Sequence, residues 1–145
     1  MPGSPGGIGD GRGIAAAFSL GAEGVQMGTA FLRCPETKLS KPFSDALASC
    51  EDNSTCITYA FSGRPARGIK NEFIKAMLNE KAEIPDFPIP NQLTGKLKAI
   101  SAKAGKAEYM SLWSGQSAAL STDLPASELI AQLVTDSEAA FKKKT

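Results

Sequence analysis

Apolar residues near the start of the chain recur at helical spacing. Ile14, Ala17 and Phe18 fall on one face of a helix expected over residues 11–20. Asp10 is placed to cap the N-terminus of this helix, because its side chain can accept a hydrogen bond from one of the first free N–H groups. The pattern therefore predicts an amphipathic helix directly after a glycine-rich loop.

A short apolar run follows this helix and predicts a buried strand over residues 24–27, which ends at Gly28-Thr29. A helix and a strand joined by so short a connection are typical of α/β folds with a parallel sheet. Glycine at the end of a buried strand lets the backbone come very close to another group. The strand end at Gly28 is therefore a candidate contact point.

The rest of the chain is expected to be mostly helical. β-Branched and aromatic residues predict an extended segment over 55–61, and prolines break a surface connection over 82–93. The expected helices cover part of 35–52, a stretch within 62–81 that presents Ile69, Phe73, Ile74 and Met77, residues 94–104, most of 109–120, and 125–141 with Leu129, Leu133 and Val134 facing inward. Because parallel strands need paired neighbours and cover on both faces, one or two strands predict the rear portion of a larger α/β fold.

Glycines gather at two points where a strand end is expected to meet a loop, Gly6-Gly7 and Gly28-Thr29. In a parallel barrel, consecutive strand ends lie side by side on one rim, and the last loops often bind phosphate. Glycine permits close backbone approach, free N–H groups face the anion, and a threonine hydroxyl adds a donor. These loops are therefore candidates for a phosphate site. The alternative is that the first loop is only a flexible turn and Gly28 only ends the strand.

Three other groups of residues are weaker candidates. Arg64 and Arg67 could contact an anion, although arginines in surface turns are usually solvated. Trp113 is expected in the core, while the Ser-Gly-Gln that follows it would suit a turn that presents a polar side chain to a cofactor edge. Met27 is expected to pack inside the fold, with its backbone N–H still able to face a ligand.

The composition indicates a broad class of protein but no particular reaction. The chain has 145 residues, a net charge of +1 and 42% hydrophobic residues, which suits one soluble domain and gives no reason to expect nucleic acid or a membrane as partner. Its three cysteines are too few for a disulfide framework, so a reducing, cytoplasmic location is expected, with a Cys50–Cys56 bridge as the alternative. The cysteine spacing and the absence of histidine argue against a zinc site.

Four ordered motifs resemble the nitronate monooxygenase family, formerly called 2-nitropropane dioxygenase. They read GGIGDGRGIAAAFSLGAEGVQMGTAFL, FSGRPARGIKNEFI, DFPIPNQLTGKL and EYMSLWSGQSAAL, and they run from Gly6 to near the C-terminus. The resemblance implies an α/β fold, the C-terminal part of a (β/α)8 TIM barrel plus a mostly helical subdomain. Residues 1–62 would then be the end of an FMN-binding barrel, and residues 63–145 a mainly helical C-terminal region.

The resemblance also implies a chemistry. Members of this family bind FMN, use no metal, and oxidise alkyl nitronates with O2 to a carbonyl compound and nitrite. Carried over by motif, Gly7, Gln26, Met27, Gly28 and Thr29 would contact FMN, mostly around its phosphate. The oligomeric state is left open.

The chain departs from the family pattern in ways that matter for catalysis. The family's catalytic base is a histidine from an earlier part of the barrel, and this chain has no histidine, so no catalytic residue is assigned. The strand expected before Gly6 is replaced by a segment with Pro2 and Pro5 and no apolar run, and the family's GGIADGRG reads GGIGDGRG here. The chain is therefore expected to be a C-terminal fragment that is inactive alone.

Two other functions remain open at this point. Flavin-dependent enoyl and quinone reductases of the same superfamily share the Gly7 loop and the QMGT loop. A non-enzymatic binding module built on a barrel remnant would instead be a stable monomer that melts cooperatively and needs no flavin.

Overall fold

The first helix begins where the sequence predicts it. In the computed structural model, which describes residues 4–79 and 83–142, α1 spans Gly11–Ser19. Asp10 adopts an extended backbone, and its Oδ1 accepts a hydrogen bond from the Gly13 N–H at 3.0 Å. Ile14 and Ala17 are buried as expected, whereas Phe18 is 39% exposed, so the apolar face of α1 is narrower than the sequence suggests.

A strand precedes the first glycine loop, contrary to the sequence-based expectation. β1 (Ser4–Pro5) pairs in parallel with β2 (Val25–Gln26), which is the strand expected over 24–27. A two-residue pairing needs only backbone groups, so it requires no apolar run. Proline is tolerated because each strand of a two-stranded sheet is an edge strand.

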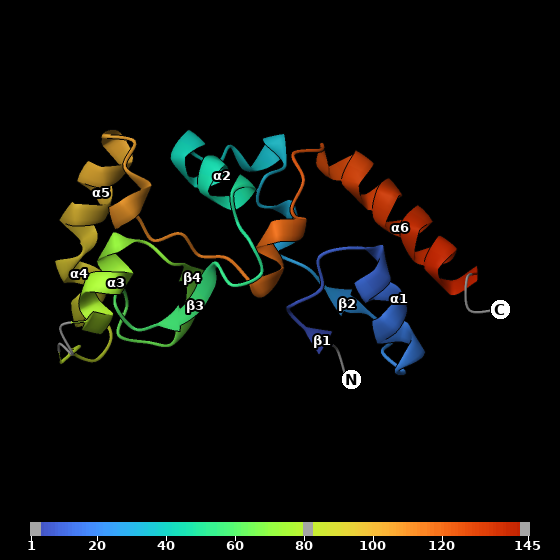
Figure 1. Cartoon of the computed structure of the whole chain (residues 1–145), viewed down its shortest axis with the longest axis horizontal. Coiled ribbons are helices and arrows are strands. Elements are labelled where there is room, and N and C mark those ends of the chain that lie inside the picture. Colours follow the sequence, from blue (N-terminus) through green and yellow to red (C-terminus); the bar gives the residue numbers. More distant parts are fainter. Residues whose placement is uncertain (1–3, 80–82, 143–145) are drawn as a thin grey trace.

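The two ends of the described chain meet through a helix pair (Figure 1). α6 (Ala126–Lys142) lies against α1, and its buried Leu129 and Leu133 share one apolar cluster with Ile14. The helices approach closely at Gly11, where a Cβ atom would lie 2.5 Å from the Cβ of Asp136. The prediction that Val134 also faces inward is wrong, since its side chain is 52% exposed. It follows Leu133 by one residue, which turns it about 100° around the helix.

A second apolar cluster lies under helix α2 (Lys41–Ala48) and an antiparallel pair formed by β3 (Thr55–Thr58) and β4 (Ala66–Ile69). Its buried members are Leu47, Ile69, Met110, Leu112 and Ala118. The helix expected within 62–81 begins later than predicted, because Ile69 belongs to β4 and not to the helical face that it was expected to share with Phe73 and Met77. The backbone of β4 pairs with β3, and the Ile69 N–H donates to the Leu112 carbonyl at 2.9 Å.

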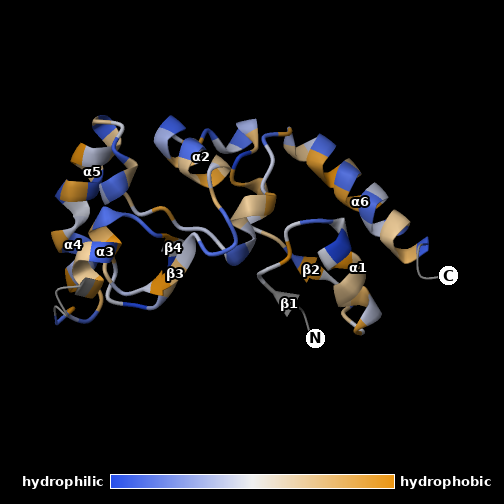
Figure 2. Ribbon diagram, in the orientation of Figure 1, coloured by the Kyte–Doolittle hydropathy of each residue, from blue (hydrophilic) through white to orange (hydrophobic). Residues whose placement is uncertain are grey.

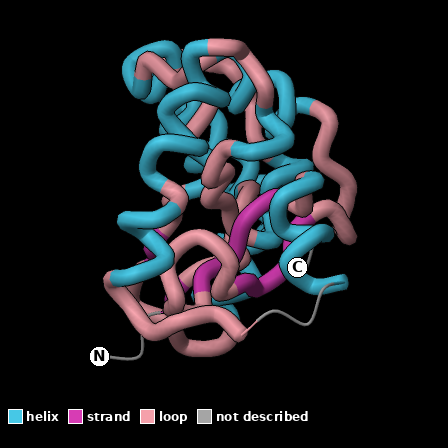
Figure 3. Tube along the Cα trace, turned by 90° about the vertical axis from the view of Figure 1, so that its left-hand side faces the viewer, coloured by secondary structure: helices cyan, strands magenta, loops and turns pink. Residues whose placement is uncertain are grey.

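The remaining helices cover one end of the molecule and carry several apolar residues (Figure 2), of which Leu78, Ile89, Leu93 and Ile100 are exposed. These helices are α3 (Glu72–Asn79), α4 (Ile89–Leu93) and α5 (Gly95–Lys103). The prediction of a helix over most of 109–120 is wrong. Only short 3-10 turns form, at Ala107–Tyr109 and Gln116–Leu120, and the chain between them is extended, with Trp113 bridged to Gly68. Helices and loops dominate the trace, and the strands are short (Figure 3).

The proposed division near residue 62 falls between β3 and β4, which pair with each other. It stays a prediction.

Cys34, Cys50 and Cys56 are all free thiols, and burial raises the pKa of Cys34 and of Cys50. Within residues 4–79 and 83–142, no helix is long and apolar enough to cross a membrane, and no cluster of three metal-ligating side chains forms.

The cap of α1 gives a testable contribution to stability. Replacing Asp10 by alanine is expected to lower the free energy of unfolding by about 1 kcal/mol, as is typical for an N-cap. Burial raises the pKa of the Asp10 carboxyl, but hydrogen bonds from the Gly13 N–H and the Arg12 guanidinium outweigh this effect and hold the pKa below its usual value. The ionised carboxylate therefore stabilises the fold above the usual aspartate pKa of about 3.9, and this contribution is lost as the pH falls through the lowered value.

Urea unfolding of the wild type and of Asp10→Ala at pH 7 and near pH 3 would measure this contribution. We expect the deficit of the variant at pH 7 to shrink in acid. Asp10→Asn is the matched control, because it keeps a capping oxygen without the charge and should lose less at pH 7. A deficit of equal size at both pH values would contradict the role of the charge.

Candidate functional site

Three loops that are far apart in the sequence line one pocket of about 330 Å³, called here the glycine pocket. The first loop (residues 6–9) connects β1 to α1, and the second loop (Gly28-Thr29) follows β2. The third loop (residues 115–117) consists of Gly115 and the first two residues of the 3-10 turn at Gln116–Leu120. In Figure 1 this orange turn lies near the middle of the molecule, between α2 and the β1–β2 pair. The lining residues are Gly6, Gly7, Ile8, Gln26, Gly28, Thr29, Gly115 and Ser117.

The glycines of the first two loops leave space that a side chain would fill. Gly6 and Gly7 have φ values of 84° and 79°, in the left-handed region that favours glycine. A Cβ built on Gly6, Gly7 or Gly28 meets no other atom within 4 Å. These positions therefore form a cradle of bare backbone, which a small anion could approach closely.

The second and third loops are joined by a hydrogen bond. The Gly115 N–H donates to Thr29 Oγ1 at 2.7 Å, so the Thr29 hydroxyl keeps its own proton for another acceptor. Gly115 itself must stay small, because a Cβ there would lie 2.9 Å from Thr29 Oγ1. This contact fixes the position of the third loop against the end of β2.

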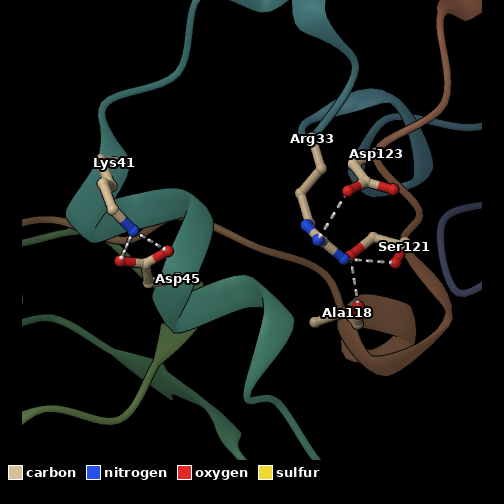
Figure 4. Close-up of polar contacts among 6 residues, drawn as sticks. All are labelled: Arg33, Lys41, Asp45, Ala118, Ser121 and Asp123. Carbon is tan, nitrogen blue, oxygen red and sulfur yellow. Dashed lines mark hydrogen bonds and ion pairs between the residues drawn. The ribbon is translucent and has the colours of Figure 1, made fainter.

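Arg33 makes a second connection between the same two parts of the chain (Figure 4). Its Nη1 donates to the Ser121 carbonyl at 3.0 Å, and its Nη2 lies 3.8 Å from a carboxylate oxygen of Asp123. The Ser121 hydroxyl in turn donates to the Ala118 carbonyl at 2.7 Å. Arg33 thus ties the segment after the second loop to the end of the 3-10 turn that begins in the third loop.

The lining of the glycine pocket contains no ionisable side chain. Its polar groups are backbone N–H groups, the hydroxyls of Thr29 and Ser117, and the amide of Gln26. A neighbouring pocket of about 470 Å³ shares Gly7 and Ser117 with it and adds Arg12 and Asp52. The arrangement can therefore bind and orient an anion, but the lining offers no group for proton transfer near neutral pH.

Four of the five residues assigned from the sequence lie together here: Gly7, Gln26, Gly28 and Thr29 line the pocket. Met27 does not, because its side chain packs against the cluster around Ile14. Met27 directly follows β2, and side chains of an extended chain alternate between its two faces, so Val25 and Met27 pack against the same cluster while Gln26 does not.

The weaker candidates lie away from this pocket. The Arg64 guanidinium stacks over the Phe87 ring at 4.4 Å, and Arg67 donates to Thr55 Oγ1 at 3.1 Å. Trp113 is 37% exposed and packs edge-on against Phe61, outside the lining.

The sequence predicts only part of the role of the third loop. The Ser-Gly-Gln after Trp113 suggested a turn near a cofactor, and Gly115 of that motif does line the pocket. No sequence pattern singled out Ser117 or joined this loop to the first two.

Comparison with known proteins places this geometry in a family. The family model described as nitronate monooxygenase matches residues 4–136. A probable nitronate monooxygenase of Staphylococcus aureus (strain Newman) is 46% identical over 129 residues, which cover 89% of this chain and 36% of that protein. The chain thus spans about a third of the length of this curated relative.

Two solved structures are similar in fold to this chain. A nitroalkane oxidase from Streptomyces ansochromogenes superposes with a TM-score of 0.90 at 35% identity, covering 99% of this chain and 41% of that one. FabK from Thermotoga maritima gives a TM-score of 0.79 at 31% identity, covering 97% and 45%. The chain therefore has the α/β fold of the C-terminal part of a TIM barrel, and the family match over residues 4–136 shows that it belongs to the nitronate monooxygenase family.

Proposed function

We propose that this chain forms the phosphate-binding side of an FMN site in a nitronate monooxygenase. The observation that carries the proposal is the convergence of Gly6, Gly7, Gly28 and Thr29 on one pocket without an ionisable lining group. A phosphate monoester needs several donors and close backbone approach, and glycine loops at adjacent strand ends supply both. The residues present therefore fit the phosphate end of FMN.

The proposed role of each loop follows from its geometry. Gly6 and Gly7 keep side chains out of the cradle, and Gly28 does the same at the end of β2. The Thr29 hydroxyl donates to a phosphate oxygen while its own oxygen accepts from the Gly115 N–H. Gln26 offers a side-chain amide toward the same space. When bound, FMN supplies the redox chemistry, whereas these residues hold and orient it.

The proposed reaction is the oxidation of an alkyl nitronate by O2 to a carbonyl compound and nitrite. A nitronate has already lost the proton from the carbon beside its nitro group, so a positioned base is needed only where the substrate is the neutral nitroalkane. None of the 145 residues is histidine, and the glycine pocket has no ionisable lining group. Because the chain also spans only about a third of the length of its curated relative, we expect it to bind the cofactor without turning over a nitronate.

Titration with FMN and with riboflavin, followed by flavin fluorescence, tests this proposal. The two flavins differ by the phosphate, so the purified chain should bind FMN and show much weaker binding of riboflavin. Nitrite release from propyl-2-nitronate in the presence of FMN should not exceed the rate with free FMN. Equal binding of both flavins would refute the phosphate-binding role, and nitrite release above the free-flavin rate would refute the expected lack of turnover.

A flavin-dependent enoyl or quinone reductase is the alternative activity within the same superfamily. Family membership favours the nitronate chemistry, because the family match extends over residues 4–136 and includes the SGRPARG and WSGQS motifs. NADH consumption by a full-length relative separates the two. A nitronate monooxygenase should consume nitronate and O2 without a nicotinamide, whereas a reductase should oxidise NADH.

A further inference from the structure

We infer that the third loop completes the phosphate site and that Ser117 donates a hydrogen bond to the bound phosphate. This inference rests on the proposed function. It adds a phosphate-binding residue from a part of the chain that lies outside the two glycine loops. Ser117 lines the glycine pocket and is half-buried. Its hydroxyl makes no hydrogen bond within the described residues, so it is free to donate into the pocket.

The third loop rests on both of the other loops. Ser117 contacts the first loop so closely that a Cβ at Gly9 would lie 2.8 Å from the Ser117 Cβ. Gly115 contacts the second loop through its N–H bond to Thr29 Oγ1. Since each contact occurs at a glycine, the third loop is seated between the first two at a separation that larger residues would not allow.

The chemistry of the lining selects the ligand class. A carboxylate facing the pocket would repel an anion, and none lies in the lining. Two hydroxyls, Thr29 and Ser117, reach the pocket from opposite loops, and each has a proton to donate. Hydrogen bonds to a charged acceptor are about twice as strong as neutral ones, so a phosphate monoester gains more from this pair of donors than a neutral ligand does.

Arg33 is the positioning residue for this arrangement. It does not line the pocket, but its bond to the Ser121 carbonyl holds the end of the 3-10 turn that carries Ser117. Arg33 therefore acts on the site through the third loop and not by contact with the anion.

Ser117→Ala tests the inference against Ser127→Ala, an exposed serine of α6 with no side-chain hydrogen bond in the described chain. The probes are inorganic phosphate, FMN and riboflavin. Loss of one hydrogen bond to a charged group should weaken FMN binding about tenfold. Riboflavin binding and the melting temperature should not change, and Ser127→Ala should match the wild type throughout.

Amide chemical shifts of a ¹⁵N-labelled chain give a readout that does not depend on the flavin. Inorganic phosphate should move the signals of Gly7, Thr29 and Gly115 together in the wild type and require about ten times more phosphate to do so in Ser117→Ala. Gly115→Ala is the second variant. It keeps the Ser117 hydroxyl but pushes on Thr29 Oγ1, so it should weaken phosphate binding as well.

The outcomes separate this inference from the proposed function. Wild-type affinity of Ser117→Ala for phosphate and FMN would overturn the role of Ser117 and leave the two-loop FMN site in place. Phosphate binding that depends on Ser117, without any preference for FMN over riboflavin, would support the third loop but overturn the proposed cofactor. No shift at Gly115 on phosphate addition would overturn the third loop as part of the site.

Discussion

Gly28→Leu is expected to weaken FMN binding by about 100-fold or more while the chain stays folded, because it removes the equivalent of at least two charge-assisted hydrogen bonds. Gly28 lines the glycine pocket, and a Cβ built there meets no atom within 4 Å. A leucine side chain would therefore enter open space and not the core. It would occupy the volume proposed for the phosphate, so the loss should appear in binding and not in stability.

Gly24→Leu is the matched control for this change. Gly24 is also exposed, lies just before the same strand β2, and leaves a built Cβ equally free, but it does not line the pocket. Flavin fluorescence gives the affinity and thermal melting gives the stability of both variants. Equal FMN affinity of Gly28→Leu and Gly24→Leu would place the phosphate somewhere other than the glycine pocket.

Phe61→Ala is expected to give the largest loss of stability, about 3–5 kcal/mol, as for other buried phenylalanines. Phe61 is 1% exposed and is the largest fully buried side chain among the described residues. Its ring lies 4.7 Å from that of Phe73 on α3 and 5.8 Å from that of Trp113. Its carbonyl also accepts a hydrogen bond from buried Thr94. Phe61 therefore joins α3 and the start of α5 to the segment that leads into the third loop.

We also expect Phe61→Ala to weaken FMN binding. Loss of the contact with Trp113 should loosen residues 113–117 and reduce FMN affinity before global unfolding. Phe141→Ala, at an exposed position near the end of α6, should change the free energy of unfolding by no more than about 0.5 kcal/mol. Urea unfolding measures both variants, and a Phe61→Ala loss as small as that of Phe141→Ala would contradict the packing role of Phe61.

Local sequence patterns predicted the elements whose stability depends on neighbouring residues. The cap at Asp10, the start of α1 and the span of β2 all follow from residues within a few positions of each other. Most of α6 follows in the same way, because its apolar residues recur at helical spacing, and α5 lies within the helix expected over residues 94–104. Val134 is exposed, contrary to the prediction, because α6 packs against α1 through the side that carries Leu129 and Leu133.

The predictions failed where the partner of a segment lies far along the chain. Ile69 fits the helical face expected with Phe73 and Met77, yet it lies in β4, because β3 offers a strand partner and the Leu112 carbonyl accepts from its N–H. The stretch over 109–120 is extended at Trp113 for the same reason, since it bridges to Gly68. A periodic pattern reports only the local preference, and long-range backbone pairing overrides it.

The sequence by itself determined the two glycine loops, the family motifs and the absence of histidine from these 145 residues. Four of the five assigned residues line one pocket, because Gly7 and Gly28 follow adjacent strands, and their contact with FMN stays a prediction. Only the tertiary structure brought in the third loop. Gly115 and Thr29 are separated by 86 residues, and no pattern along the chain encodes the hydrogen bond that joins them. Gly115 is held near Thr29 because Leu112 and Ala118, on either side of it in the chain, are buried in the second apolar cluster, which is a property of packing and not of spacing.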